Sequence, residues 1–354
     1  MPVAGTRATA ARSVGLRGFA FYPMLKGRIM RALVYTAPRQ MTFKELARPR
    51  PPAGECEIAV TTAGICGSDL SGFLGRSRHR TPPLVMGHEL VGRSPGGRRV
   101  VANPLIGCGQ CAACLNGEQN LCSDFRLLGM DQTSGCHAEF VAVPQSHVYE
   151  IPDHLTDARA VLTEPLANIV HLFRIAAPPP NFRMGIVGGG TMGSMALLMA
   201  RRMEAREILV EDVSVVRLET ARQMGATLAV NAGDEQGRSF AGYGLDLVLD
   251  ACGASAARQR AFDLCRPGGM VVLLGMGQAR SEIDFAASIR KEHRVVMSFA
   301  YTPADFERAL QLLVDGEIDL SPWTAELPLE EGQKAFEWMT TAPGTTLRML
   351  LRVS

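Results

Sequence analysis

Four cysteines stand close together in one short stretch of the chain. They are separated by two, two and seven residues: Cys108, Cys111, Cys114 and Cys122. Four thiolates at this spacing can surround one Zn²⁺ ion tetrahedrally and make a closed structural site. An iron–sulfur cluster also takes four thiolates, but it usually has a different spacing and a proline after the last cysteine, where Ser123 stands here. The spacing therefore favours a structural zinc site.

A second set of metal-ligand types is spread over three motifs. These are Cys66-Gly67-Ser68-Asp69, Gly87-His88-Glu89 and Glu164-Pro165-Leu166. A thiolate, an imidazole and a carboxylate suit a catalytic zinc that keeps one coordination position open. Each has an ordinary alternative: Cys66 as a small buried apolar residue, His88 as a core or surface histidine, and Glu164 as a charge at a helix N-terminus. Together, ahead of a nucleotide-binding motif, they predict a catalytic zinc site.

The segment from Gly188 to Gly193 has glycine at the first, third and sixth positions of a dinucleotide-binding loop. It follows an apolar run at 184–187 and leads into a stretch of helical character at 194–200. Gly188 permits the tight turn, Gly190 lets the backbone approach a pyrophosphate, and Gly193 lets helix and strand pack closely. The loop, with Thr191 and Met192 inside it, is therefore predicted to bind a dinucleotide.

An acidic residue ends the next predicted strand. The run 208–212 finishes on Glu211 and Asp212, at the place, about 20 residues past the loop, where an acid accepts the ribose hydroxyls. Asp212 would repel a 2′-phosphate, so NAD is favoured over NADP. Glu211 is interpreted as a solvated or strand-edge residue. Arg217 is a candidate contact to a 2′-phosphate, but Asp212 would have to be bypassed, so its preferred interpretation is a helix-surface charge.

Two kinds of element must position these residues. From Met30 to about Val143, short β-rich runs such as 57–62 and 139–143 are broken by Gly and Pro, which suggests a barrel-like β domain. After the prolines at 178–180 the pattern becomes one of apolar runs that alternate with helical stretches, which indicates a doubly wound parallel sheet. These runs lie at 184–187, 208–210, 245–249 and 270–274, and a helix at 303–314 and a strand at 349–351 follow.

Length and charge limit the class of protein. The 354 residues are enough for two domains, and Lys plus Arg exceed Asp plus Glu by only 37 to 35. This balance argues against nucleic acid or a membrane surface as partner and leaves a small molecule. No run approaches the ~20 apolar residues that cross a bilayer, so a soluble, cytoplasmic protein is expected. Nine cysteines, an odd number without a secretory signal, favour metal or catalytic thiols over disulfides.

Residues 1–29 differ from the rest in composition. They carry five basic residues and no Asp or Glu, which is the composition of an organelle transit peptide. An upstream extension ahead of a domain that begins at Met30 is the simpler interpretation and is preferred. We therefore expect 1–29 to be an extension, disordered or targeting, outside the folded domains.

From Met30 onward the chain resembles the zinc-dependent branch of the medium-chain dehydrogenase/reductase family. The resemblance rests on the motifs above and on Arg266-Pro267-Gly268-Gly269 before the run 271–275. It implies a GroES-like β-barrel catalytic domain at 30–175 and a Rossmann NAD-binding domain at 176–298. It also implies a segment at 299–354 that completes the Rossmann edge and returns to the catalytic domain. Glu164-Pro165-Leu166, Lys291-Glu292 and Phe299-x-Tyr301 make polyol and threonine dehydrogenases the nearest branch, which points to secondary alcohols.

The resemblance also implies a mechanism. A catalytic Zn²⁺ binds the alcohol oxygen and lowers its pKa, so that hydride passes to NAD while Ser68 relays the proton. Cys66 and His88 are implied ligands. Either Glu89 or Glu164 completes the set, and the other holds the zinc-bound water or enters during turnover.

Further residues follow or depart from the family's pattern. Asp69 is implied to orient His88, and Arg348 stands where a basic residue near the pyrophosphate is common. Ser71 replaces a histidine that often passes the proton outward, and Ala300 replaces an arginine of many polyol enzymes. The stretch 88–100 is shorter than in relatives, with 91–98 in place of a full strand pair, so the barrel is expected to close differently there.

Two further readings stay open at this point. A threonine-type amino-alcohol dehydrogenase would use the same metal and cofactor, and a catalytically silent homologue would bind NAD as a sensor or structural partner. The family implies a homodimer or homotetramer joined through the edge of the Rossmann sheet.

Overall fold

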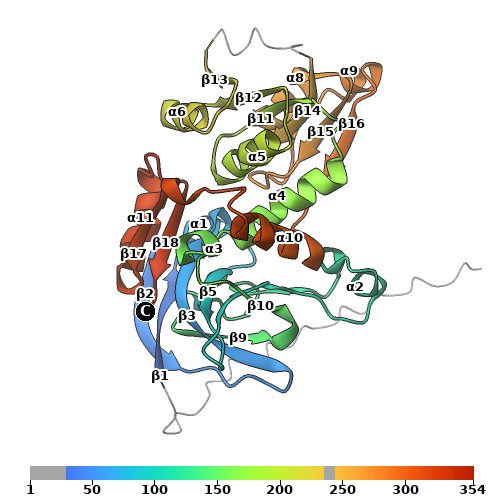
Figure 1. The fold of residues 1–354 in the computed structure, drawn as a ribbon. Helices are drawn as coiled ribbons and strands as arrows, with labels where there is room; N and C mark the ends of the chain where they lie inside the picture. Colours follow the sequence, from blue (N-terminus) through green and yellow to red (C-terminus); the bar gives the residue numbers. More distant parts are fainter. Residues whose placement is uncertain (1–28, 235–243) are drawn as a thin grey trace, which may run out of the picture.

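The computed structural model describes residues 29–234 and 244–354. A barrel-like β part and a parallel-sheet part lie at opposite ends of the molecule, and two helices lie between them (Figure 1). These are α4 (Thr163–Ala176) and α10 (Pro303–Val314). The expected extension at 1–29 lies outside the described residues apart from Ile29, which begins β1. Within the described residues, no helix is both long and apolar enough to cross a membrane.

The barrel part is built mainly from antiparallel strands. A seven-stranded sheet has the order β10-β6-β5-β3-β18-β17, and β9 also pairs with β3. Its strands are β3 (Glu55–Ile65), β5 (Glu89–Arg93), β6 (Arg99–Ala102), β9 (Phe140–Pro144), β10 (Val148–Glu150), β17 (Thr324–Pro328) and β18 (Arg348–Arg352). A three-stranded sheet holds β1 (Ile29–Ala37), β2 (Gln40–Ala47) and β4 (Leu84–Val85), and a two-stranded sheet holds β7 (Leu105–Ile106) and β8 (Arg126–Leu127). Inward-facing residues such as Ile58 and Val60 of β3 fill one buried core, as the alternation of a half-buried strand requires.

The expected loss of a strand pair after His88 is wrong. Strands β5 and β6 pair antiparallel, with Val91 opposite Val101. A tight turn joins them, in which Ser94 donates its backbone N–H to Arg98 and Gly97 adopts a positive φ of 77°. Glycine tolerates that conformation without strain. The short segment therefore shortens the hairpin but does not remove it.

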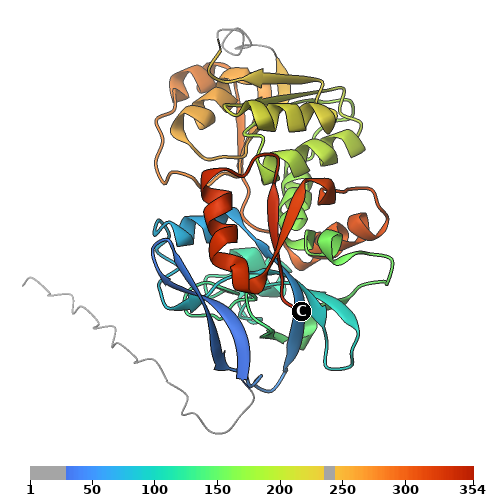
Figure 2. The ribbon, with the colours of Figure 1, turned by 90° about the vertical axis from the view of Figure 1, so that its left-hand side faces the viewer.

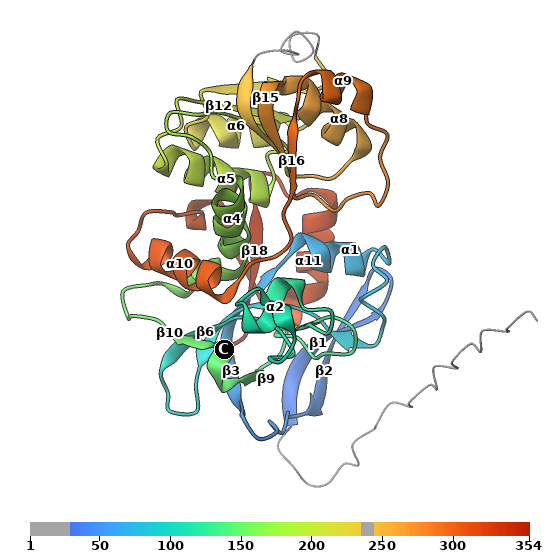
Figure 3. The ribbon, with the colours of Figure 1, turned by 90° about the vertical axis from the view of Figure 1, so that its right-hand side faces the viewer.

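The second part is a six-stranded parallel sheet in the order β13-β12-β11-β14-β15-β16. This is the strand order of a Rossmann fold. The four predicted strands are β11 (Arg183–Val187), β12 (Glu207–Asp212), β14 (Leu245–Asp250) and β15 (Cys265–Leu273), and the two that were not predicted are β13 (Leu228–Asn231) and β16 (Arg294–Met297). The helices of this part are α5 (Thr191–Arg202), α6 (Val215–Gln223), α8 (Ser255–Leu264) and α9 (Phe285–Arg290). The sheet and its edge strand β16 are seen from another side in Figure 3.

The C-terminal segment differs from one part of its expectation. It was expected to complete the edge of the Rossmann sheet, but the last strand of that sheet, β16, ends at Met297. Strands β17 and β18 instead pair with each other in parallel, and β18 continues onto β3 with Met349 opposite Ile65. Helix α11 (Gly332–Thr341) lies against the barrel beside these strands (Figure 2). The segment therefore returns to the barrel, as expected, and forms its strand hydrogen bonds there.

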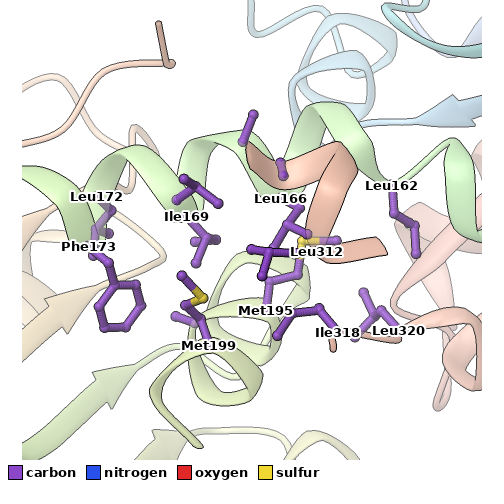
Figure 4. Close-up of a cluster of buried hydrophobic side chains, with 14 of the residues drawn as sticks. Leu162, Leu166, Ile169, Leu172, Phe173, Met195, Met199, Leu312, Ile318 and Leu320 are labelled. Carbon is purple, nitrogen blue, oxygen red and sulfur yellow. The ribbon is translucent and has the colours of Figure 1, made fainter. Parts of the chain in front are cut away.

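Helix α4 connects the two parts through its apolar face. Side chains of Leu166, Ile169 and Phe173 point towards Met195 and Met199 of α5 (Figure 4). Full burial of each such side chain contributes about 1.5–3 kcal/mol. The helix ends at Ala177, which is left-handed and precedes a run of prolines that cannot continue a helix. The shorter helices are α1 (Gly67–Phe73), α2 (Ala112–Leu115) and α3 (Asp157–Ala160), and the 3₁₀ turns are η1 (Gln119–Leu121), η2 (Gln145–His147), η3 (Ser321–Trp323) and η4 (Leu329–Glu331).

Candidate active site

Strand register brings three metal-ligand residues together. Cys66 follows β3 directly and caps α1, while His88 and Glu89 lie at the start of β5. Strands β3 and β5 are antiparallel neighbours with Gly64 opposite Glu89. One ligand atom from each of the three side chains lies within 4.8 Å of the other two. A side chain on Gly64 would meet Glu89 Oε2 at 2.1 Å, so glycine is required for the carboxylate to fit.

The carboxylate of Glu89 is buried without a hydrogen bond. Neither of its oxygens has a hydrogen-bond partner in the described residues, although Arg348 Nη1 lies 3.2 Å from Oε1. Burial raises the pKa of Glu89 well above its usual value, and Arg348 opposes that shift. A buried carboxylate of this kind needs a cation to offset its lost hydration. The orphaned oxygens beside a thiol and an imidazole therefore fit a zinc ion.

The thiol and the imidazole are electrostatically complementary. Burial alone would raise the pKa of Cys66, but His88 and Arg348 lower it to about 5. Burial alone would lower the pKa of His88, but Asp69 and Cys66 raise it to about 10. The site therefore favours a thiolate, which is the form of cysteine that binds metal.

Asp69 lies behind the histidine, at ion-pair distance and without a hydrogen bond to it. Its Oδ1 atom is 3.6 Å from His88 Nδ1, and its Oδ2 atom accepts the backbone N–H of Cys66 at 3.1 Å. The side chain is fully buried, and the guanidinium of Arg80 pairs with it at 3.0 Å. A carboxylate beside a metal-binding imidazole favours its positive form and can orient the ring when the two form a hydrogen bond.

Glu164 lies next to the trio and outside it. It is in the first turn of α4, where a negative charge is favoured by the helix dipole. Burial raises its pKa, while His88 opposes that shift. The group of ligand atoms within 4.8 Å contains Glu89 and not Glu164. Of the two carboxylates that the sequence left open, geometry brings Glu89 to Cys66 and His88.

The hydroxyl of Tyr301 was not among the predicted site residues. The side chain is 1% exposed, and its hydroxyl faces the carboxylate of Glu164 without a hydrogen bond of standard geometry within the described residues. Burial and the nearby Glu164 raise the pKa of Tyr301 well above its usual value. In the sequence, the motif Phe299-x-Tyr301 indicated only a branch of the family. The aromatic hydroxyl in this motif was the signal that could have marked Tyr301 as a site residue.

The four-cysteine loop also forms one cluster. One ligand atom from each of its thiols lies within 4.8 Å of the others, and all four cysteines are free of disulfides. The backbone N–H of Cys108 donates to Cys122 Sγ at 3.4 Å. The donor set therefore fits a tetrahedral zinc. In the same four-cysteine loop, the side-chain amide of Asn120 donates to the carbonyl oxygen of Phe299 at 2.9 Å. This hydrogen bond connects the loop to the segment that carries Tyr301.

The dinucleotide loop has the geometry expected from its glycines. Gly188 has a φ of 105°, and a side chain on Gly193 would meet the carbonyl oxygen of Gly188 at 1.9 Å. Gly190 faces open space at the N-terminus of α5, where a phosphate can approach. The hydroxyl of Thr191 donates to the carbonyl oxygen of Leu347 at 2.5 Å. The side chain of Met192 packs partly against the core, which leaves its backbone as the part that can face a cofactor.

Asp212, at the end of β12, lies beside Arg217 of α6. Asp212 Oδ2 accepts the backbone N–H of Gly189 at 2.7 Å, and Arg217 Nη1 is 3.6 Å from the same oxygen. The expectation that Glu211 is solvated is wrong. It is buried, and Arg260 Nε donates to both of its carboxylate oxygens, because alternate residues of a strand face opposite sides of the sheet.

Arg348 occupies a different position from the one expected near the pyrophosphate. Its backbone follows Leu347, which contacts α5 through Thr191, but its side chain is directed towards the metal-ligand trio. Nη1 donates to the carbonyl oxygen of Ile65 at 2.9 Å, and the side chain is 2% exposed. The guanidinium lies at ion-pair distance from Glu89 without a hydrogen bond to it, so it offsets part of the cost of burying that carboxylate.

Comparison with known proteins connects this geometry to a family. Residues 52–153 match the alcohol dehydrogenase GroES-like domain, and residues 191–315 match the zinc-binding dehydrogenase domain. The chain is 31% identical over 328 residues to L-threonine 3-dehydrogenase of Saccharopolyspora erythraea, covering 87% of this chain and 95% of that one. It is 29% identical to sorbitol dehydrogenase of Bacillus subtilis, with 87% and 93% covered.

A solved structure gives the same result for the fold. An alcohol dehydrogenase from Escherichia coli CFT073, in complex with NADH, superposes with a TM-score of 0.86 at 26% identity, covering 92% of this chain and all of that one. Zinc and a nicotinamide dinucleotide, NAD(P), are accordingly the cofactors of this protein. The chain belongs to the zinc-dependent alcohol dehydrogenases of the medium-chain dehydrogenase/reductase family and is an alcohol-oxidising enzyme.

Proposed function

We propose that this enzyme transfers hydride from a secondary alcohol, a polyol or sugar alcohol, to NAD. The observation that carries the proposal is the trio of a half-buried Cys66 and the buried His88 and Glu89, with Glu164 and Tyr301 beside it. A thiolate, an imidazole and a carboxylate leave a fourth position open, as a catalytic zinc site requires. The four-cysteine cluster is the structural site in this proposal.

Each residue of the site has its own role in the proposed reaction. Zinc, when bound, supplies a Lewis acid that lowers the pKa of an alcohol, and the nicotinamide accepts the hydride. Cys66, His88 and Glu89 hold the metal, and Asp69 keeps the imidazole in the orientation for binding. Ser68, two residues after the thiol, is the group that takes the alcohol proton.

A polyol fits the polar groups that lie beside the trio, the hydroxyl of Tyr301 and the carboxylate of Glu164. The hydroxyl of Tyr301 is buried, faces the carboxylate of Glu164 and makes no hydrogen bond of standard geometry within the described residues. A buried donor without a partner costs about 1–3 kcal/mol. A substrate with a second hydroxyl group can accept from Tyr301 or donate to Glu164, and so recovers that cost. The likeness to sorbitol dehydrogenase of Bacillus subtilis supports the same substrate class.

NAD is proposed as the preferred cofactor over NADP. The buried carboxylate of Asp212 lies at the end of β12, where the ribose hydroxyls of a dinucleotide bind. Its negative charge would repel a 2′-phosphate. Arg217 is partly exposed, and its Nη1 atom lies 3.6 Å from the carboxylate, so its charge is shared with Asp212.

The proposed assembly is a symmetric homodimer or homotetramer formed through β16, in the cytoplasm. Strand β16 pairs only with β15 among the described strands, and it exposes Val295 and Met297 along its edge. An open apolar strand edge is a template for pairing with a second copy. The nine cysteines are all free, which fits a reducing compartment.

The experiment that tests the proposed function follows reduction of NAD and of NADP at the nicotinamide absorbance. The alcohols are a panel of polyols, sugar alcohols, threonine and simple secondary alcohols, and zinc is measured on the same sample. Turnover of a polyol with NAD and about two zinc ions per chain is the expected result. Turnover of threonine and of no polyol would overturn the substrate class. Two zinc ions with no turnover of any alcohol would overturn the whole proposal.

A further inference from the structure

One guanidinium group bridges two residues behind the trio. Arg80 lies between α1 and β4, and only 4% of it is exposed. Its Nε atom donates to Asp69 Oδ1 at 3.1 Å, and its Nη2 atom donates to Ser68 Oγ at 2.9 Å. The carboxylate that faces His88 and the hydroxyl that takes the proton are therefore held by the same side chain.

The chain reserves space for this arginine. A side chain on Gly72 of α1 would place its Cβ 2.4 Å from Arg80 Cδ and 3.0 Å from Arg80 Cβ. The glycine thus lets the arginine stem lie directly against the helix that carries Ser68 and Asp69. Burying a guanidinium is costly unless its charge is paired, and Asp69 provides that pair at 3.0 Å.

The hydrogen bond to Ser68 restricts what its hydroxyl can do. A serine hydroxyl donates one hydrogen bond and accepts two. Arg80 fills one acceptor position, because a guanidinium can only donate. One acceptor position and the O–H donor of Ser68 remain. The hydroxyl can therefore accept a proton at that single position and release the proton of its O–H group to another acceptor. Arg80 does not carry the proton itself, since arginine stays protonated in proteins.

We propose that Arg80 is the positioning residue of the proton relay: its contact with Ser68 orients the hydroxyl for transfer in one direction, while its ion pair with Asp69 fixes the group behind His88. This inference rests on the proposed function of Ser68.

The test compares Arg80→Lys, Ser68→Ala and the double variant with the wild-type enzyme. Lysine keeps a positive charge beside Asp69. Its single ammonium group cannot reproduce the simultaneous hydrogen bonds of the guanidinium to Asp69 and Ser68. Arg80→Lys is expected to lower kcat about 10–100-fold, with KM for NAD and the zinc content unchanged. Its solvent deuterium isotope effect on kcat is expected to rise, because proton transfer becomes slower. The double variant is expected to be no slower than Ser68→Ala alone.

The controls separate this inference from folding and from the proposed function. Arg76→Lys, an exposed residue of the same loop, is expected to match the wild type. If Arg80→Lys does not fold, Arg80→Gln takes its place. Suppose the wild type is active and Arg80→Lys lowers kcat by the same factor in the wild type and in the Ser68→Ala background. The two residues would then act independently, which would overturn this inference but not the proposed function. A wild type without turnover of any alcohol would overturn the proposed function, and this inference with it.

Discussion

The Nδ1 atom of His171 lies 2.7 Å from Oδ2 of Asp305, and this contact joins the helix of Glu164 to the helix that begins two residues after Tyr301. Asp305 also accepts from Arg174 Nε at 2.7 Å and from the hydroxyl of Thr302 at 2.7 Å. Helix α10 begins with a capping box of Thr302 and Asp305 and with a proline at 303. One buried carboxylate therefore fixes the start of α10 against α4 and holds Tyr301 near Glu164.

The first prediction concerns that carboxylate. Asp305→Asn is expected to lower the free energy of unfolding by about 2–3 kcal/mol, because it weakens charge-assisted hydrogen bonds. Burial raises the pKa of Asp305, but bonds from His171 and Arg174 hold it well below its usual range. A depressed folded pKa contributes stability that is present above the unfolded pKa of about 4 and is lost as pH falls further. The difference from wild type should therefore be present above about pH 5 and shrink below about pH 4.

Urea unfolding at several pH values measures this difference. Asp315→Asn is the matched control, since Asp315 is exposed at the other end of α10 and accepts only from Gln311 within the described residues. The control is expected to change the unfolding free energy by less than about 0.5 kcal/mol. An equal loss in both variants would contradict the assigned role of Asp305. The KM for the alcohol is also expected to rise in Asp305→Asn, because Tyr301 is released.

The second prediction separates the two metal sites. Cys66→Ala should lose one of two zinc ions and lower kcat/KM by about 10³-fold or more, since Lewis-acid stabilisation is worth several kcal/mol. Cys114→Ser should lose the other zinc ion and lower the unfolding temperature. Elemental analysis of zinc with thermal unfolding checks both variants. Retention of both zinc ions in either variant would show that its cysteine is not a ligand.

The third prediction distinguishes the two carboxylates. Glu89 belongs to the trio within 4.8 Å, whereas Glu164 lies outside it. Glu89→Gln is therefore expected to weaken zinc binding, about 10–100-fold or more. Glu164→Gln is expected to keep zinc and to lower kcat/KM for the alcohol. Zinc dissociation constants from competition with a chelator make the comparison, and the reverse pattern would exchange the two roles.

The fourth prediction concerns cofactor choice. Asp212→Ser removes the charge that would repel a 2′-phosphate and leaves Arg217, which lies 3.6 Å from that carboxylate in the wild type, without it. The ratio of kcat/KM for NAD to that for NADP is expected to fall about 10–100-fold, equal to about 1.4–2.8 kcal/mol. Adding Arg217→Ala to this variant should remove the gain with NADP. If Asp212→Ser leaves the ratio of kcat/KM for NAD to that for NADP unchanged, the ribose hydroxyls do not bind at Asp212.

Much of this architecture could be predicted because local spacing carries it. The four-cysteine loop and the glycines at 188, 190 and 193 act through residues close in sequence, so their geometry follows from their spacing. The helix at 303–314 was predicted with the bounds that the structure gives it, because its cap and its apolar periodicity are both local. Strands β13 and β16 were missed, since four residues are too few to establish a period.

The contacts that could not be predicted join residues far apart in the chain. Arg80 is one basic residue in a polar loop, and nothing local indicates that it turns inward to Ser68 and Asp69. The direction of Arg348 depends on the register of β18 against β3, which brings it to Ile65 across 283 residues. His171 and Asp305 are 134 residues apart and meet only because α4 and α10 pack together.

The last prediction concerns the open edge of the parallel sheet. Met297 is 78% exposed at the end of β16, and Val295 of the same strand is 43% exposed. In a symmetric dimer that continues the sheet, these side chains become buried in both copies, so a charge introduced at either position is buried twice. Met297→Asp is therefore expected to shift the protein from a dimer or tetramer to smaller species in light scattering coupled to gel filtration. Phe43→Asp, on β2 of the barrel, is the control and should leave the mass unchanged. A wild-type protein that is monomeric at micromolar concentration, or a Met297→Asp variant of unchanged mass, would exclude β16 as the interface.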